Sequence, residues 1–152
     1  MTALVVGVGQ PDRCDDAAGL LVAEEVRRRA PRCEVVTVTS PTRLIDVWDG
    51  RDDVVVVDAV RTGRDPGEVS VVEVTERPLP ARPGAGGSHG FGIAEAVELA
   101  RSLDRLPRRL VVVGIEAGSF AQGSEMTPAV TAAAAGAVRA VLEALPDENQ
   151  EG

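Results

Sequence analysis

Short runs rich in valine, leucine and isoleucine, separated by segments with a helical hydrophobic stripe, constrain the fold of this chain most. The runs cover residues 3–8, 34–38, 54–57, 69–74 and 110–115. Only 2% of the residues are aromatic whereas 44% are hydrophobic, so the core must be built from aliphatic side chains. Such runs are typical of parallel strands that helices bury on both faces.

Helix signals occupy most of the segments between these strands and the segment after the last one. We expect Asp15 or Asp16 to cap a helix that ends near Ala30, and Ser40 with Pro41 to open a short helix that ends at residue 50. Apolar residues at helical spacing predict a third helix, and Thr127 with Pro128 opens the last one. The stripe of the third helix consists of Ile93, Ala96, Val97 and Ala100.

The strand at 69–74 is expected to run antiparallel to the others. Only ten residues, 59–68, precede it, and a parallel crossover needs a dozen or more. The sequence therefore predicts a three-layer α/β/α sandwich with a five-stranded, mostly parallel sheet. We expect one domain over 1–145, a disordered acidic tail at 146–152, and a functional, mobile loop rich in proline and glycine at 77–88.

Charge and composition exclude several classes of protein. The net charge is −8, which disfavours contact with the phosphates of nucleic acid. No apolar run is long enough to cross a membrane. We expect no signal peptide, and the two cysteines, Cys14 and Cys33, fit a reduced cytoplasmic setting.

Three polar residues are predicted to meet at one edge of the sheet. Asp16 follows the first strand, Asp58 ends the third strand, and His89, the only histidine, lies at the start of the third helix. Ligands of open α/β sheets bind beyond the carboxyl ends of the strands, at the point where the strand order reverses. We therefore take these residues as the candidate site.

Two kinds of chemistry suit such a site. Two carboxylates and an imidazole could hold a divalent transition metal with open positions for water or substrate. Alternatively, the two aspartates could share a proton and act directly as acid and base. Each residue also has a simpler interpretation: a helix cap for Asp16, bonds to loop amides for Asp58, and an idle exposed ring for His89.

Other candidates are weaker. Glu116 follows the last strand and is either a substrate contact or merely solvated. Cys14 as a nucleophile is disfavoured, because neighbouring carboxylates raise the pKa of a thiol. The glycines near residue 9 begin like a dinucleotide-binding loop, but Asp12 stands where the third glycine belongs and would repel a pyrophosphate.

An ordered set of motifs resembles the hydrogenase maturation endopeptidases, over residues 3–145. The family opens with a strand and Gly-x-Gly-Asn, followed after four residues by an acidic pair with glycines. Gln10 replaces the asparagine, residues 11–14 replace a mostly apolar stretch, and Ala17 replaces a glycine. The matching positions are Gly7, Gly9, Asp15, Asp16, Gly19, Asp58, Ala59, Pro66, Gly67, Val69, Ser88, His89, Gly114, Ile115, Glu116, Met126, Thr127 and Pro128.

The resemblance implies an endopeptidase that removes the C-terminal extension of the nickel–iron hydrogenase large subunit after nickel insertion. Asp16, Asp58 and His89 would be both the catalytic residues and the ligands of nickel, which the substrate supplies. The mechanism would be metal-linked or of the aspartic type. We expect a cytoplasmic monomer whose partner is the large-subunit precursor. The alternatives are a non-catalytic nickel-centre checkpoint factor and a metal-dependent hydrolase of small molecules.

Overall fold

Five strands form one mixed sheet in the computed structural model, which describes residues 3–75, 92–119 and 125–146. Their order across the sheet is β2-β1-β3-β5-β4. All neighbours are parallel except β4, which is antiparallel to β5, so the predicted direction of that strand is confirmed. The strands are β1 (Leu4–Val8), β2 (Glu34–Val38), β3 (Asp53–Val60), β4 (Val69–Glu73) and β5 (Arg109–Glu116).

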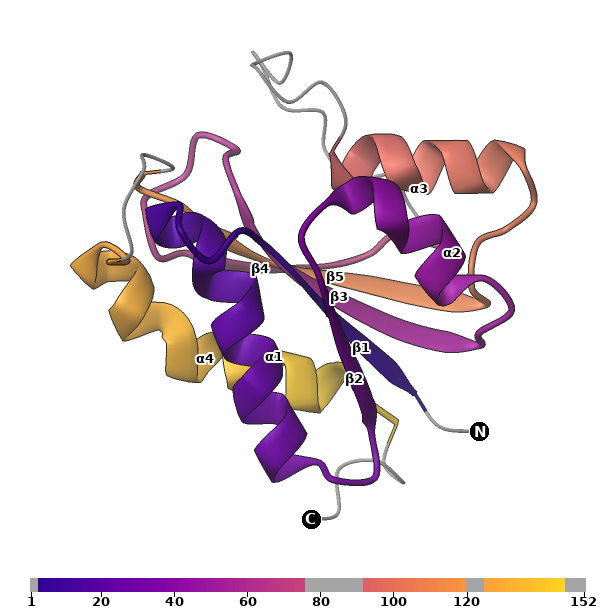
Figure 1. The fold of residues 1–152 in the computed structure, drawn as a ribbon, viewed down its shortest axis with the longest axis horizontal. Coiled ribbons are helices and arrows are strands. Elements are labelled where there is room, and N and C mark those ends of the chain that lie inside the picture. The colour runs from indigo at the N-terminus through magenta and orange to yellow at the C-terminus, as the bar shows by residue number, and fades with distance from the viewer. Residues whose placement is uncertain (1–2, 76–91, 120–124, 147–152) are drawn as a thin grey trace.

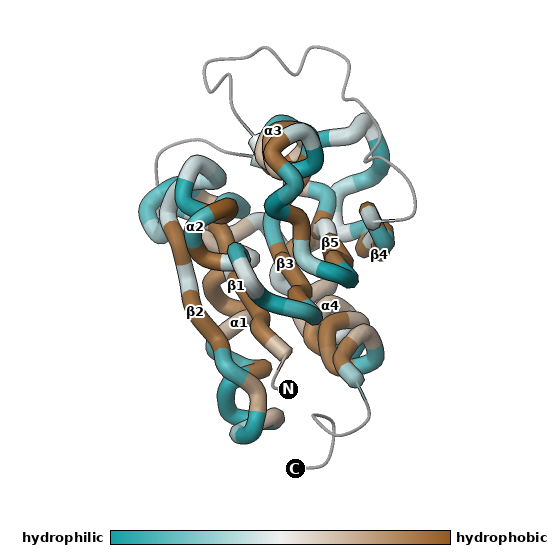
Figure 2. Tube along the Cα trace, turned by 90° about the vertical axis from the view of Figure 1, so that its right-hand side faces the viewer, coloured by the Kyte–Doolittle hydropathy of each residue, from teal (hydrophilic) through white to brown (hydrophobic). Residues whose placement is uncertain are grey.

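Two pairs of helices cover the two faces of the sheet (Figure 1). One layer contains α1 (Ala18–Arg29) and α4 (Pro128–Ala144), and the other contains α2 (Leu44–Trp48) and α3 (Ile93–Ser102). Each layer closes over its own core, one around Val55, Val57 and Val113 and the other around Val54, Val56 and Trp48. The brown, hydrophobic strands in Figure 2 lie between these layers. The predicted three-layer sandwich is confirmed.

Most of the predicted helix starts are confirmed. Ser40 is the N-cap of the 3-10 turn η2 (Pro41–Arg43), and its side chain accepts a hydrogen bond from the Thr42 amide. Thr127 is the N-cap of α4, with Pro128 in its first turn. The predicted cap of the first helix is wrong, because a 3-10 turn, η1 (Cys14–Ala17), precedes α1 and the N-cap residue is Ala17.

Strand β3 extends beyond its predicted end at residue 57. It continues to Val60 because β5 pairs with it along its whole length, from Arg109 opposite Asp53 to Glu116 opposite Val60. Asp58 therefore lies within the strand, opposite Gly114. Its side chain is on the same face as Val54 and Val56, which is the face covered by α2 and α3.

The strand order reverses next to β1, whose two neighbours are β2 and β3. Open α/β sheets bind ligands beyond the carboxyl ends of the strands at such a point, which here lies between β1 and β3. Within the described ranges, no helix is long and apolar enough to cross a bilayer. Both cysteines are free thiols, as the sequence suggested. The loop at 77–88 and the tail after residue 146 lie outside the described residues.

Candidate functional site

Asp16 and Asp58 both lie at the carboxyl edge of the sheet, beside the point where the strand order reverses. Asp16 belongs to η1, which follows β1, and Asp58 lies near the end of β3. Both side chains are half-buried. The two acids are close enough for the charge of Asp16 to raise the pKa of Asp58. The structure thus brings together two of the three predicted site residues.

Glycines allow the start of α1 to approach the strands closely enough to place these acids. A Cβ atom on Gly19 would lie 2.4 Å from the carbonyl oxygen of Val8 and 2.6 Å from that of Val57. A Cβ atom on Gly9 would lie 2.0 Å from the carbonyl oxygen of Asp16. No larger residue fits at either position without moving the backbone, so these two glycines fix the distance between Asp16 and the ends of the strands.

The carboxylate of Asp16 is bound by the segment that precedes it in the sequence. The backbone amide of Gln10 donates a hydrogen bond to Oδ2 of Asp16, over 3.1 Å. The side chain of Gln10 in turn donates to the carbonyl oxygen of Thr39, over 2.7 Å, in the loop that follows β2. Gln10 therefore links the Asp16 carboxylate to the loop after β2. Its side chain is long enough to reach the carbonyl oxygen of Thr39.

Asp58 lies in an environment that favours the neutral carboxylic acid. Burial raises its pKa well above the usual range, and the neighbouring Asp16 carboxylate raises it further. A hydrogen bond from the backbone of Ala59 offsets this only in part. Paired carboxyl groups with a strongly perturbed pKa are typical of catalytic sites.

Asp15 is not a helix cap, although the sequence suggested that role. Its side chain is completely buried and turns away from α1 towards the segment after β5 and the start of α4. Its carboxylate accepts hydrogen bonds from the amides of Gly118, Ser119 and Thr127 and from the hydroxyl of Thr127. Burial acts to raise the pKa of Asp15, but these hydrogen bonds together lower it below its ordinary value.

Glu116 is also buried rather than solvated, with 3% of its surface exposed. Its carboxylate accepts hydrogen bonds from the amide and the hydroxyl of Thr62, over 2.8 and 2.6 Å. These bonds anchor the start of the loop between β3 and β4 to β5. The sequence hints at such a role only through the position of Glu116, which directly follows the last hydrophobic residue of a strand.

His89 lies outside the described residues, so its predicted meeting with the two aspartates stays a prediction. Gly92, three residues further along, is the N-cap of α3. The other end of α3 is at the amino edge of the sheet, because Arg101 donates to the carbonyl of Val74, which itself follows β4. The start of α3 therefore lies towards the carboxyl edge of the sheet, where the two aspartates also lie. The described part of the chain contains no group of three potential metal-ligating side chains.

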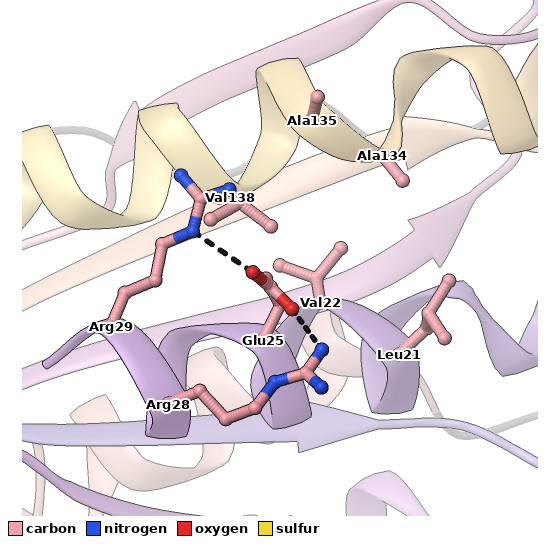
Figure 3. Close-up of a pocket in the computed structure, with 8 residues that line it drawn as sticks. All are labelled: Leu21, Val22, Glu25, Arg28, Arg29, Ala134, Ala135 and Val138. Atoms are coloured by element: carbon pink, nitrogen blue, oxygen red, sulfur yellow. Dashed lines mark hydrogen bonds and ion pairs between the residues drawn. The ribbon is translucent and has the colours of Figure 1, made fainter. Parts of the chain in front are cut away.

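A separate groove lies between α1 and α4, with a volume of about 280 Å³ (Figure 3). Its lining is largely aliphatic, and Glu25 bridges Arg28 and Arg29 at one side. Glu25 is nine residues beyond Asp16, which corresponds to roughly 13 Å along a helix. The groove is also on the face of the sheet opposite the Asp58 side chain, so it is not part of the candidate site.

A carboxylate pair at the carboxyl edge of an open α/β sheet defines a candidate hydrolase site, and comparison with known proteins identifies the class. Residues 5–144 match the family model HycI, described as hydrogenase maturation protease. The chain therefore belongs to the hydrogenase maturation protease family, and its activity is that of a peptidase. The resemblance seen in the sequence motifs is confirmed.

Individual relatives agree with this assignment. The chain is 26% identical to the hydrogenase 2 maturation protease of Escherichia coli, over 99% of this chain and 94% of that protein. It is 29% identical to the hydrogenase expression/formation protein HupD of Bradyrhizobium diazoefficiens, over 84% of this chain and 69% of that protein. Among solved structures, the hydrogenase maturating endopeptidase HybD from E. coli superposes with a TM-score of 0.76 at 25% identity, covering 95% and 91% of the two chains.

The structure accommodates the departures from the family motif. Ala17 has φ −79° and ψ −7°, an ordinary right-handed helical conformation that requires no glycine. Gln10 provides the backbone amide that holds Asp16, and this interaction does not depend on the side chain. Cys14, at the start of η1, has a φ of 48°, in the left-handed region that few non-glycine residues adopt.

Proposed function

We propose that this peptidase removes the C-terminal extension of the large-subunit precursor of a nickel–iron hydrogenase, after nickel has been inserted. The family assignment supports hydrogenase maturation as the process. The observation that carries the proposal is the pairing of Asp16 with Asp58 at the carboxyl edge of the sheet, where burial and the neighbouring charge raise the pKa of Asp58. Such a pair can bind a cation or take part in proton transfer.

Nickel belongs to the substrate in this proposal. The oxygen atoms of Asp16 and Asp58 are suitable ligands for a divalent metal, and a cation between them would relieve the repulsion that raises the pKa of Asp58. His89 would add a nitrogen ligand. Only three peptide links separate it from Gly92, and a chain of that length spans at most about 11 Å. Nickel would serve as the recognition signal and polarise the reacting groups.

Hydrolysis of the peptide bond also requires that the attacking water lose a proton and that the leaving amine gain one. Two carboxyl groups that differ in proton affinity can divide these tasks. Both a metal-linked and an aspartic mechanism use Asp16 and Asp58, so both predict that loss of either carboxylate stops processing.

The test is processing of a nickel-loaded precursor that is co-expressed with the protease. Asp16→Asn retains the size of the side chain but removes its charge, and His89→Ala removes the imidazole. We expect both variants to lose processing by orders of magnitude, because each 1.36 kcal/mol of lost transition-state stabilisation is about tenfold in rate. Asp52→Asn is the matched control, since Asp52 is exposed and precedes β3 at the opposite edge of the sheet.

Complete processing by Asp16→Asn and His89→Ala would refute the assigned roles. Absence of processing by the wild type, with a verified client precursor, would favour a checkpoint factor that recognises nickel without cleaving the peptide. Monomeric state and cytoplasmic location stay predictions, to be measured by light scattering of the purified protein and by cell fractionation.

A further inference from the structure

The carboxylate of Asp15 is turned towards the segment after β5 and the start of α4. Its carboxylate receives the amides of Gly118 at 2.7 Å, Ser119 at 2.9 Å and Thr127 at 2.6 Å, and the Thr127 hydroxyl at 2.8 Å. Its own amide donates to the carbonyl of Ser119, over 3.1 Å. We call this set of contacts the Asp15 clamp.

The Asp15 clamp joins η1 to two segments that lie more than 100 residues further along the chain. It connects η1, the segment directly after β5 and the first residue before α4, across separations of 103 to 112 residues. Space around it is tight, because a Cβ on Gly118 would lie 3.3 Å from Oδ2 of Asp15 and 3.3 Å from Oγ1 of Thr127. A carboxylate held by converging amides in this way has little freedom to move.

One peptide link separates this clamp from Asp16. The position of η1 is set on one side by the Asp15 clamp and on the other by the hydrogen bond from the Gln10 amide to Asp16. If the clamp were released, η1 could shift relative to the strand ends, and Asp16 would move with it. The carboxylate of Asp58 would not move, because β3 is fixed by pairing with β1 and β5.

We propose that Asp15 is a positioning residue of the protease, which acts through Asp16 by holding η1 against the segment after β5 and the start of α4. Its consequence for catalysis rests on the proposed function. The geometric part of the proposal, that Asp15 sets the position of the Asp16 carboxylate, does not rest on the proposed function, because it concerns only the folded protein.

The geometric part is tested by NMR of the full chain, with the backbone amide of Gln10 as the reporter of Asp16. Asp15→Asn keeps the side-chain shape but places an amide group against converging N–H donors. Thr127→Val removes the hydroxyl donor while Thr127→Ser retains it. We expect the Gln10 resonance to shift, and its hydrogen exchange to accelerate about tenfold or more, in Asp15→Asn and Thr127→Val. Thr127→Ser should resemble the wild type.

Asp53→Asn is the control for a general loss of stability, because Asp53 pairs with Arg109 at the amino edge of the sheet, away from η1. The proposal is overturned if the Gln10 amide is unchanged in both Asp15→Asn and Thr127→Val, or if Asp53→Asn changes it equally. Thr127→Val decides the question on its own if Asp15→Asn does not fold.

The catalytic part is tested with the nickel-loaded precursor. A misplacement of about 1 Å can lower a rate roughly hundredfold. We expect kcat to fall by about this factor in Asp15→Asn while KM for the precursor stays within about twofold. A rise in KM alone would overturn the positioning role. If the wild type itself does not process the precursor, the proposed function fails, and the NMR measurement still decides whether Asp15 positions Asp16.

Discussion

Replacement of Gly19 by alanine tests whether close contact between α1 and the strands sets the site. The new Cβ would lie 2.4 Å from the carbonyl oxygen of Val8, about 1 Å shorter than an ordinary van der Waals contact of 3.4 Å. Because the obstacles are backbone atoms of two strands, α1 must move outward by about this amount. Asp16, three residues before Gly19, would move away from Asp58.

The expected effects on stability and on activity differ in size. Overpacking costs roughly 1–3 kcal/mol, whereas alanine in place of a helical glycine contributes about 1 kcal/mol in the opposite direction. The net loss should be about 0–2 kcal/mol, which lowers Tm by at most roughly 8 °C for a chain of this size. Processing of the nickel-loaded precursor should fall by about a hundredfold, since a 1 Å misplacement can have that effect.

Gly136→Ala is a matched control. Gly136 is within α4, and a Cβ at that position would meet nothing within 4 Å. The same substitution should therefore raise stability by about 1 kcal/mol and leave processing unchanged. Thermal unfolding and the electrophoretic shift of the large subunit measure both quantities. If Gly19→Ala unfolds and processes like the wild type, the reasoning from close contact is wrong.

Three further predictions concern ionisable groups. Asp58→Asn should stabilise the metal-free protein at neutral pH but not below about pH 4. The raised pKa of Asp58 in the folded state makes its ionisation cost about 1.4 kcal/mol of stability per pKa unit as pH rises, and asparagine does not ionise. Equal urea midpoints of the variant and the wild type at pH 7 would contradict this. Asp15→Asn should have the opposite pH dependence, with its largest loss of stability near neutral pH and a smaller loss as pH falls through the lowered pKa of Asp15; a pH-independent loss would count against it. A thiol reagent at pH 8 should label the half-buried Cys14 but not Cys33, because burial raises the pKa of the Cys33 thiol to about 11. Mass spectrometry of the labelled peptides tests this, and labelling of Cys33 in preference to Cys14 would contradict it.

Much of the fold could be predicted because local patterns and tertiary structure agree. The valine run at 54–57 is completely buried, as its lack of polar residues required. The short connection before β4 excluded a parallel crossover, and the strand is indeed antiparallel. The helical stripe of α3, from Ile93 to Ala100, faces the core throughout. In each case, a signal within about ten residues was sufficient.

The roles of Asp15 and Glu116 could not be predicted, because their partners are far away in the sequence. The cap assigned to the acidic pair is a sound local expectation, but backbone amides after β5 compete for Asp15 and bind it instead. Thr62, which is 54 residues from Glu116, similarly decides the role of that carboxylate. Asp16 and Asp58 were found because the carboxyl ends of parallel strands lie together in any such sheet.

Trp48 gives this protein a single fluorescent reporter. The chain contains one tryptophan and no tyrosine, and the indole is fully buried in the core beneath α2 and α3, with no hydrogen-bond partner for its Nε1 within the described structure. Its emission should therefore be blue-shifted in the native state and move to longer wavelength on unfolding. Asp58 projects from the same face of the sheet. Tryptophan fluorescence of the unlabelled protein can therefore report disruption of the layer of α2 and α3, separately from changes confined to the layer of α1 and α4.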